Sequence, residues 1–137
     1  MRLRPIAVVR NGVFETPDDW DKVVSELVFR KEFVPGLFKV SHFRHLWVIF
    51  GFDRVRNTLM RVHPMRDPSI PIVGVFASCS PTRPNKLGLT LARLVKVRNN
   101  VVTVKGLDAF DGSPVYDIKP PEDEIDYRPA SAGKKSR

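Results

Sequence analysis

The chain has 137 residues, 42% of them hydrophobic, and its 23 basic and 15 acidic residues give a formal net charge of +8. This length fits one globular domain with a real core, and the positive excess fits either a polyanion partner or a surface kept basic for solubility. The single cysteine, Cys79, excludes an intrachain disulfide and a cysteine zinc site. We expect a cytoplasmic protein with no metal and no membrane segment, because the N-terminus lacks a signal-peptide pattern and the longest apolar run, residues 46–51, is short.

The first third of the chain predicts a strand, a short helix and a second strand. Residues 5–10 are short, apolar and β-branched, which favours a strand. Thr16 has the features of an N-cap and precedes Pro17, so we expect a short helix over residues 17–24. Residues 26–33 mix β-branched, aromatic and charged side chains, which is typical of a half-exposed strand.

The next segment predicts helical turns followed by a buried strand. Leu37, Val40 and Phe43 recur every three residues, which indicates one or two helical turns. Residues 46–52 are apolar on both faces, which is typical of a fully buried central strand. We interpret His45, beside this strand, as a histidine whose hydrogen bonds are satisfied inside the core.

Positive charge is concentrated between residues 53 and 67, around a short predicted strand at residues 59–62. Such a run is usually a solvated face, but guanidinium groups also match phosphate oxygens in a bidentate way. The candidate RNA contacts are Arg54, Arg56, Arg61, Arg66 and Lys86.

Residues 74–88 predict a rigid polar loop that could hold a ligand. Pro81 and Pro84 fix backbone dihedrals, so such a loop loses little entropy on binding. Beyond it, residues 89–98 and 101–105 predict a hairpin, because Asn99-Asn100 tolerates the positive φ of a tight turn. A turn at Asp111-Gly112 and a last short strand over residues 115–118 follow.

About seven short strands with one or two short helices predict a mainly β fold that closes, or nearly closes, as a small barrel. We expect the barrel domain to cover residues 1–121. Residues 122–137 predict a flexible tail whose basic end, residues 134–137, contacts anions. The sequence has no Rossmann fingerprint, Walker loop or nucleophile elbow.

Two polar segments, residues 78–88 and 108–117, each follow a predicted strand, so a barrel could place both at one rim. Arg83 and Asn85 offer donors for a carboxylate and an adenine edge. Asp108 and Asp111 could accept hydrogen bonds from ribose hydroxyls or an amino group, and Phe110 could stack on a base. The alternative is that Asp111-Gly112 is only a turn and Arg83 only a surface charge.

Four motifs, in order, resemble the TrmO (TsaA-like) family. They are FxHLWVIF at residues 43–50, HPxxDPxxP at 63–71, GVFAxxSPxRPNxxGL at 74–89 and GLDxxDGxPVxDIKP at 106–120. The resemblance implies a small β-barrel that acts as an S-adenosyl-L-methionine-dependent tRNA (adenine-N6)-methyltransferase. The implied substrate is the threonylcarbamoyladenosine next to the anticodon of tRNA, and the implied assembly is a homodimer with the cofactor near its interface.

Carried over position by position, the resemblance implies a set of S-adenosyl-L-methionine contacts on the polar loop and on the segment before the last strand. These are Phe76, Ala77, Ser78, Cys79, Ser80, Arg83, Pro84, Asn85, Gly88, Leu89, Leu107, Asp108, Ala109, Phe110, Asp111 and Gly112.

The chain departs from the family pattern at several positions. Cys79 and Val73 stand where the family commonly has arginine, Lys86 stands where it has proline, and Asp53 aligns with a family histidine. These departures leave two alternatives open: a divergent S-adenosyl-L-methionine-binding paralogue with another substrate, or a non-catalytic RNA-binding barrel.

The general base is unassigned. The acceptor nitrogen must lose a proton, and the candidates to take it are Asp53, Asp111 and Asp117.

Overall fold

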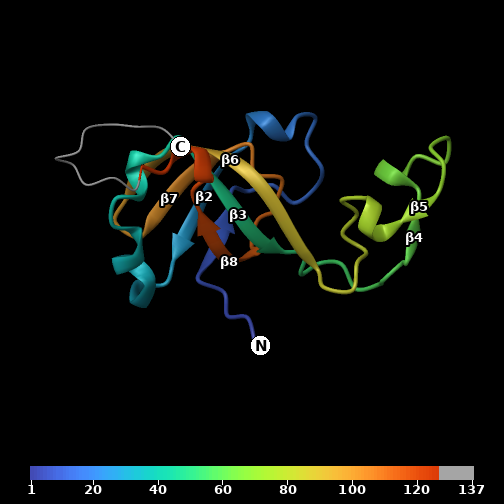
Figure 1. Cartoon of the computed structure of the whole chain (residues 1–137), viewed down its shortest axis with the longest axis horizontal. Helices are drawn as coiled ribbons and strands as arrows, with labels where there is room; N and C mark the ends of the chain where they lie inside the picture. Colours follow the sequence, from blue (N-terminus) through green and yellow to red (C-terminus); the bar gives the residue numbers. More distant parts are fainter. Residues whose placement is uncertain (127–137) are drawn as a thin grey trace.

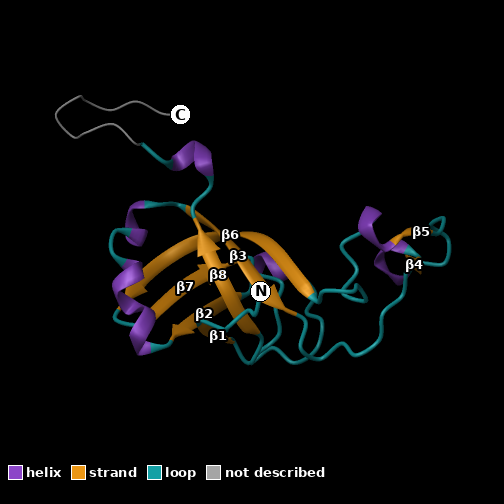
Figure 2. Ribbon diagram, turned by 60° about the horizontal axis from the view of Figure 1, so that its bottom comes forward, coloured by secondary structure: helices purple, strands orange, loops and turns teal. Residues whose placement is uncertain are grey.

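The computed structural model describes residues 1–126 as a closed antiparallel β-barrel with a long arm (Figures 1 and 2). The strands follow one another around the barrel in the order β1, β2, β7, β6, β3, β8, and β8 pairs with β1 to close it. The mainly β barrel predicted from the sequence is therefore confirmed. Its strands are β1 (Ala7–Arg10), β2 (Val24–Phe29), β3 (His45–Gly51), β6 (Leu87–Arg98), β7 (Val101–Lys105) and β8 (Pro114–Lys119).

The element counts differ from the prediction of about seven strands and one or two helices. Residues 1–126 hold eight strands, of which six form the barrel and two, β4 (Arg61–Val62) and β5 (Val73–Gly74), pair with each other outside it. The helices of this part of the chain are short 3-10 turns. They are η1 (Trp20–Lys22), η2 (Lys31–Leu37), η3 (Val40–His42), η4 (Pro64–Arg66), η5 (Val75–Ala77) and η6 (Glu122–Glu124).

The core fills the barrel, and each strand contributes alternate side chains to it. In β3 the side chains of Leu46, Val48 and Phe50 are buried, whereas Trp47 and Ile49 are half-exposed on the outer face. The prediction that this strand is buried on both faces was wrong, because a barrel strand turns only one face to the core.

The predicted helix over residues 17–24 was also wrong. Only η1 forms, and its N-cap is Asp19, whose carboxylate accepts the backbone N–H of Asp21 at 3.0 Å, rather than Thr16. The ladder between β2 and β7 begins at Val24, so the last residue of the predicted helix is paired in the sheet instead. The strand predicted over residues 26–33 likewise lies at Val24–Phe29, and η2 follows it.

The hairpin of β6 and β7 is confirmed. Asn99 has φ +55°, and the Asn100 side chain donates to the carbonyl of Phe29 at 2.9 Å, which fixes the turn against the end of β2. The last predicted strand is confirmed as β8.

The arm, residues 53–86, leaves the barrel after β3 and returns at β6. It projects from the barrel at the end opposite η2 and η3 (Figures 1 and 2). At its base the N–H of Phe52 donates to the carbonyl of Lys86 at 2.9 Å, and further out the N–H of Leu59 donates to Thr82 at 2.8 Å. The two legs of the arm are therefore tied together by backbone hydrogen bonds.

The prediction that His45 lies in the core was wrong. The residue is half-exposed at the start of β3. Its Nδ1 lies 2.7 Å from Oε2 of Glu124, whose Oε1 accepts the N–H groups of Arg44 and His45. Burial raises the pKa of Glu124, but these hydrogen bonds outweigh it, so the pKa lies below its usual value. Glu124 thus ties η6 to the start of β3; the rest of the predicted tail, residues 127–137, lies outside the described residues.

Candidate functional site

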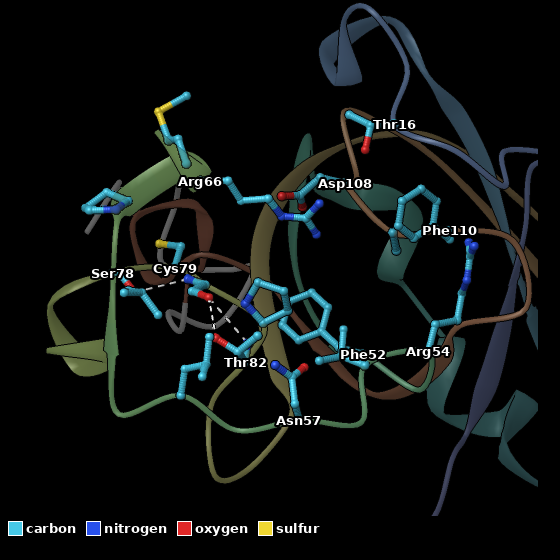
Figure 3. Close-up of a pocket in the computed structure, with 18 of the residues that line it drawn as sticks. Thr16, Phe52, Arg54, Asn57, Arg66, Ser78, Cys79, Thr82, Asp108 and Phe110 are labelled. Carbon is cyan, nitrogen blue, oxygen red and sulfur yellow. Dashed lines mark hydrogen bonds between the residues drawn. The ribbon is translucent and has the colours of Figure 1, made fainter. Parts of the chain in front are cut away.

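A cleft of about 1060 Å³ lies between the arm and the rim of the barrel (Figure 3). The rim contributes mainly aromatic and small side chains: Thr16, Trp20, Phe50, Phe52, Asp108, Ala109, Phe110 and Ser113. The arm contributes polar, basic and apolar groups: Asp53, Arg54, Val55, Asn57, Leu59, Arg61, Val62, His63, Pro64, Met65, Arg66, Ser78, Cys79, Ser80, Pro81 and Thr82.

Phe110 forms an aromatic platform at the rim. Its ring meets the edge of Trp20 with centroids 5.4 Å apart, and the guanidinium carbon of Arg54 lies 4.5 Å from the ring centroid. Arg54 is held in turn by a 2.7 Å hydrogen bond from Nη1 to the carbonyl of Phe14. The guanidinium lies over one face of the ring, so a planar base in the cleft would stack on the other face.

The opposite wall is the turn of the arm at Ser78, Cys79 and Ser80. The hydroxyl of Ser78 donates to the carbonyl of Val75 at 2.8 Å, and the hydroxyls of Ser80 and Thr82 lie 2.8 Å apart. The exposed thiol of Cys79 lines the cleft between these two seryl groups. This wall therefore offers hydroxyl groups and a thiol to the cleft.

Arg83 faces its own loop rather than the cleft. Its Nη1 donates to the carbonyls of Ser78 and Ser80 at 3.0 Å each and to that of Val75 at 3.4 Å. Lys86 acts similarly at the base of the arm, where Nζ donates to groups of Asn57, Thr58 and Arg83. In this geometry both cations hold the arm in shape, so the predicted contacts of Arg83 with cofactor and of Lys86 with RNA stay predictions.

The candidate acids fall into two groups. Asp53 and Asp108 line the cleft, and Asp108 accepts a hydrogen bond from the hydroxyl of Thr90. Asp117 lies on β8 and caps the N–H of its neighbour Ile118 at 2.9 Å, outside the cleft. Asp111 also lies outside the lining, in the turn where Gly112 has φ +85°. Among the three candidate bases, then, Asp53 lies in the cleft.

Asp111 ties the turn before β8 to the N-terminal loop, and its ionisation should be linked to stability. The N–H groups of Gly12 and then Asn11 donate to its Oδ1 at 2.8 Å each, and they lower its pKa from 3.8. Because the folded-state pKa is depressed, this stabilisation is present above the unfolded pKa and is lost as pH falls through the folded pKa.

We expect Asp111→Ala to lower the free energy of unfolding near neutral pH and to differ less from wild type below about pH 4. Urea unfolding across this range measures the difference. Asp111→Asn is the matched control, because it keeps the acceptor oxygen but does not titrate. A difference between wild type and Asp111→Ala that is independent of pH would contradict this assignment.

The structure brings together part of the predicted cofactor set and separates the rest. Six predicted contacts line the cleft: Ser78, Cys79, Ser80, Asp108, Ala109 and Phe110. Ten do not: Phe76, Ala77, Arg83, Pro84, Asn85, Gly88, Leu89, Leu107, Asp111 and Gly112. Of these, Leu107 and Gly88 are buried in the barrel and Leu89 lies on its outer face.

Three of the predicted RNA contacts also line the cleft. Arg54, Arg61 and Arg66 are exposed along it, and Figure 3 shows Arg66 extending from the arm into the cleft. Arg56 is exposed but lies outside the lining. The positive charge of the arm therefore borders the aromatic platform.

Sequence reasoning missed several lining residues. Trp20, Phe52, Asn57 and Thr16 line the cleft, but none of the four motifs contains them. Their common feature is spatial, because the N-terminal loop, the arm and the segment before β8 converge only in the folded barrel. No spacing in the sequence indicates this convergence.

Two further observations concern residues 1–126. In this part of the chain no group of three or more His, Cys, Asp or Glu side chains is placed to hold a metal ion. Nor does it contain a helix long and apolar enough to cross a membrane.

These features place the chain in the class of small closed antiparallel β-barrels with a cleft at the rim. Within this class, a family model described as the tRNA-methyltransferase O N-terminal domain matches residues 9–127. The chain belongs to this family, which confirms the resemblance found in the motifs.

Curated relatives cover the chain to different extents. It is 38% identical over 132 residues to an S-adenosyl-L-methionine-binding protein of Archaeoglobus fulgidus, covering 92% of this chain and 93% of that protein. It is 43% identical over 87 residues to the tRNA (adenine(37)-N6)-methyltransferase of Mus musculus, covering 62% of this chain but 20% of that protein. The chain thus spans nearly all of the first relative and about a fifth of the second.

Solved structures show the same fold. A crystal structure of TrmO superposes with a TM-score of 0.74 at 26% identity, covering 93% of this chain and 60% of that one. TrmO from Pseudomonas aeruginosa gives a TM-score of 0.72 at 26% identity, covering 93% of this chain and 58% of that one. The chain therefore spans somewhat more than half the length of these structures.

Proposed function

We propose that the chain binds S-adenosyl-L-methionine in the cleft and methylates N6 of an adenine in tRNA. The observation that carries the proposal is the cleft itself, in which residues of two family motifs, Ser78–Ser80 and Asp108–Phe110, face each other across one space. The names of the relatives support both the donor and the reaction. The chain spans little of the mammalian enzyme, so the activity is proposed for this chain and not taken over from it.

The residues of the cleft fit the chemical groups of the donor. Phe110 offers a ring face to the adenine, and Asp108 offers carboxylate oxygens to ribose hydroxyls or the methionyl amino group. A volume of about 1060 Å³ is large for a ligand pocket, so it leaves room for an acceptor base beside the donor. Bound S-adenosyl-L-methionine supplies an electrophilic methyl group.

The contribution of the protein is to position the acceptor and remove a proton. The arginines of the arm, Arg54, Arg61 and Arg66, hold the phosphates around the target adenine. Asp53 is the base we propose, because its carboxylate lines the cleft and the other two candidates do not. Holding the reacting atoms together in a confined site supplies much of the rate enhancement.

The specific substrate we propose is the threonylcarbamoyladenosine next to the anticodon. A transfer assay with radiolabelled S-adenosyl-L-methionine tests it, using tRNA that carries this modification and the same tRNA without it. We expect label in the modified tRNA only. Label in neither, with cofactor still bound, would favour a paralogue with another substrate, and absence of cofactor binding would favour a non-catalytic RNA-binding barrel.

We also propose that the chain forms a homodimer, as the family resemblance implies. An apolar stripe on the outer face of β6 supports it, because Leu87, Leu89 and Leu91 are 38%, 62% and 42% exposed. Strand β3 extends the stripe, since Ile49 pairs with Leu89 and Trp47 pairs with Leu91. A partner copy would cover this stripe. Sedimentation equilibrium should give twice the chain mass of 15.6 kDa, and a monomer mass at micromolar concentration would contradict the proposal.

The remaining expectations stay proposals. We infer a cytoplasmic location, supported by the tRNA substrate proposed above and by a free, exposed cysteine. A barrel domain over residues 1–121 and a separate tail over residues 122–137 remain the proposed organisation.

A further inference from the structure

The outer face of the β6–β7 hairpin carries a second group of cations. Arg93 on β6 lies directly opposite Lys105 on β7, and Lys96 and Arg98 follow on β6 toward the turn. We call these four residues the hairpin cations. Arg93, Lys96 and Arg98 are exposed, and Lys105 is half-exposed.

The placement of Arg93 opposite Lys105 is unfavourable for the barrel alone. Directly opposed residues of an antiparallel pair have Cβ atoms about 5 Å apart, and like charges there destabilise the sheet. The neighbour of Arg93 on its other side is His45 of β3, so the row across three strands contains no acid. Such an arrangement indicates that an anion outside the chain compensates the charge.

Two acids on neighbouring elements are engaged with other cationic groups. Glu26 of β2, opposite Thr103, lies 2.9 Å from Nε of Arg10, and Glu124 binds His45. Glu122 also has a partner, and Asp123 lies beside it on η6. In the described part of the chain none of the hairpin cations forms an ion pair.

Arg93 is separated from the base of the arm along β6. The arm joins β6 at Leu87, and Arg93 is six residues further, a distance of about 20 Å at the rise of a β-strand. On β3 the cleft is lined by Phe50, whereas the partner of Arg93 is His45 at the other end of that strand. Arg93 therefore lies apart from the arginines of the arm, whereas an RNA backbone is long enough to contact both.

We propose that the hairpin cations form a second phosphate-binding surface, which holds the backbone of the same tRNA outside the cleft. This inference rests on the proposed function and adds a contact that the cleft does not include. Its role is affinity and orientation, because phosphate contacts position a nucleic acid without reading its sequence.

The test is the double variant Arg93→Gln with Lys105→Gln in the full chain, with tRNA binding measured by fluorescence anisotropy over a range of salt concentrations. We expect the affinity to fall about tenfold and the slope of log K against log salt to decrease by roughly 1.4–1.8, because two phosphate contacts are lost. The melting temperature should stay the same or rise, since the opposed like charges are removed. Affinity for S-adenosyl-L-methionine should not change.

The matched control is Arg2→Gln with Arg4→Gln, which removes the same charge from the segment before β1. Strand β1 lies three strands from β6 and two from β7 around the barrel, so this pair does not adjoin Arg93 or Lys105. We expect it to bind tRNA like wild type. Equal losses in the two double variants would show a general effect of net charge and overturn the inference.

Wild-type affinity and slope in the Arg93/Lys105 variant would overturn the inference while leaving the proposed function intact. Absence of tRNA binding by the wild-type chain would overturn both. Titration with S-adenosyl-L-methionine needs no RNA, so it shows in either case whether the cofactor part of the proposed function holds.

Discussion

Replacement of Arg83 by alanine should lower the affinity for S-adenosyl-L-methionine by roughly tenfold to a hundredfold while leaving the barrel folded. Hydrogen bonds from charged groups contribute about 1.5–3 kcal/mol each, and Nη1 of Arg83 holds three carbonyls of the wall that contains Ser78 and Ser80. Without this group the wall loses its fixed shape, and ordering it again on binding costs affinity. The barrel itself makes no hydrogen bond to Arg83, so its unfolding should change little.

Two further variants distinguish this role from a direct contact. Arg83→Lys keeps a cationic donor and should retain part of the affinity, whereas Arg56→Ala removes an exposed charge of the arm outside the cleft lining and should retain all of it. Calorimetric titration measures the affinities, and circular dichroism checks the fold. Unchanged affinity in Arg83→Ala would show that the order of this wall does not matter for the cofactor.

Replacement of Gly88 by alanine should destabilise the barrel by about 1–3 kcal/mol, the usual cost of overpacking a core. A Cβ atom at Gly88 would lie 2.5 Å from Cζ and 2.8 Å from both Cε atoms of Phe50. The Phe50 ring cannot move aside easily, because it is 1% exposed and lies opposite Gly88 in the ladder between β3 and β6. Thermal unfolding should show the loss as a shift of several degrees.

Gly74 provides the matched control for this prediction. A Cβ there would meet nothing within 4 Å, and its φ of −63° suits any residue, so Gly74→Ala should be nearly neutral. The second variant Phe50→Leu in the Gly88→Ala background should recover part of the stability. Equal melting temperatures for Gly88→Ala and wild type would mean that the core yields more readily than its packing indicates.

Local patterns in the sequence predicted the elements whose structure depends on local contacts. The β6–β7 hairpin follows from Asn99-Asn100, which accepts a positive φ, and β1 and β8 follow from short β-branched runs. Predictions failed where tertiary pairing decided the outcome. The helix predicted after a Thr16 cap does not form, and sheet pairing begins at Val24. Strand β3 is buried on one face rather than two, because a barrel strand turns one face to the core.

The site was predictable only in part, for a similar reason. The motifs identified the two segments that meet in the cleft, yet they could not show that Arg83 faces its own loop or that Gly88 makes room for Phe50. The Phe110 platform contacts Trp20 and Arg54, and no sequence motif links these three residues. Contacts of this kind depend on which loops share one rim of the barrel.

Calorimetric titration of the chain with S-adenosyl-L-methionine tests the central claim, that the cleft is a cofactor site. We expect one binding event per chain, weakened roughly tenfold or more by Phe110→Ala, because stacking on an aromatic side chain contributes about 1–3 kcal/mol. The matched control is Phe38→Ala, which removes a ring that is 80% exposed and outside the cleft. Absence of binding by the wild-type chain, or equal affinity in Phe110→Ala, would contradict the account.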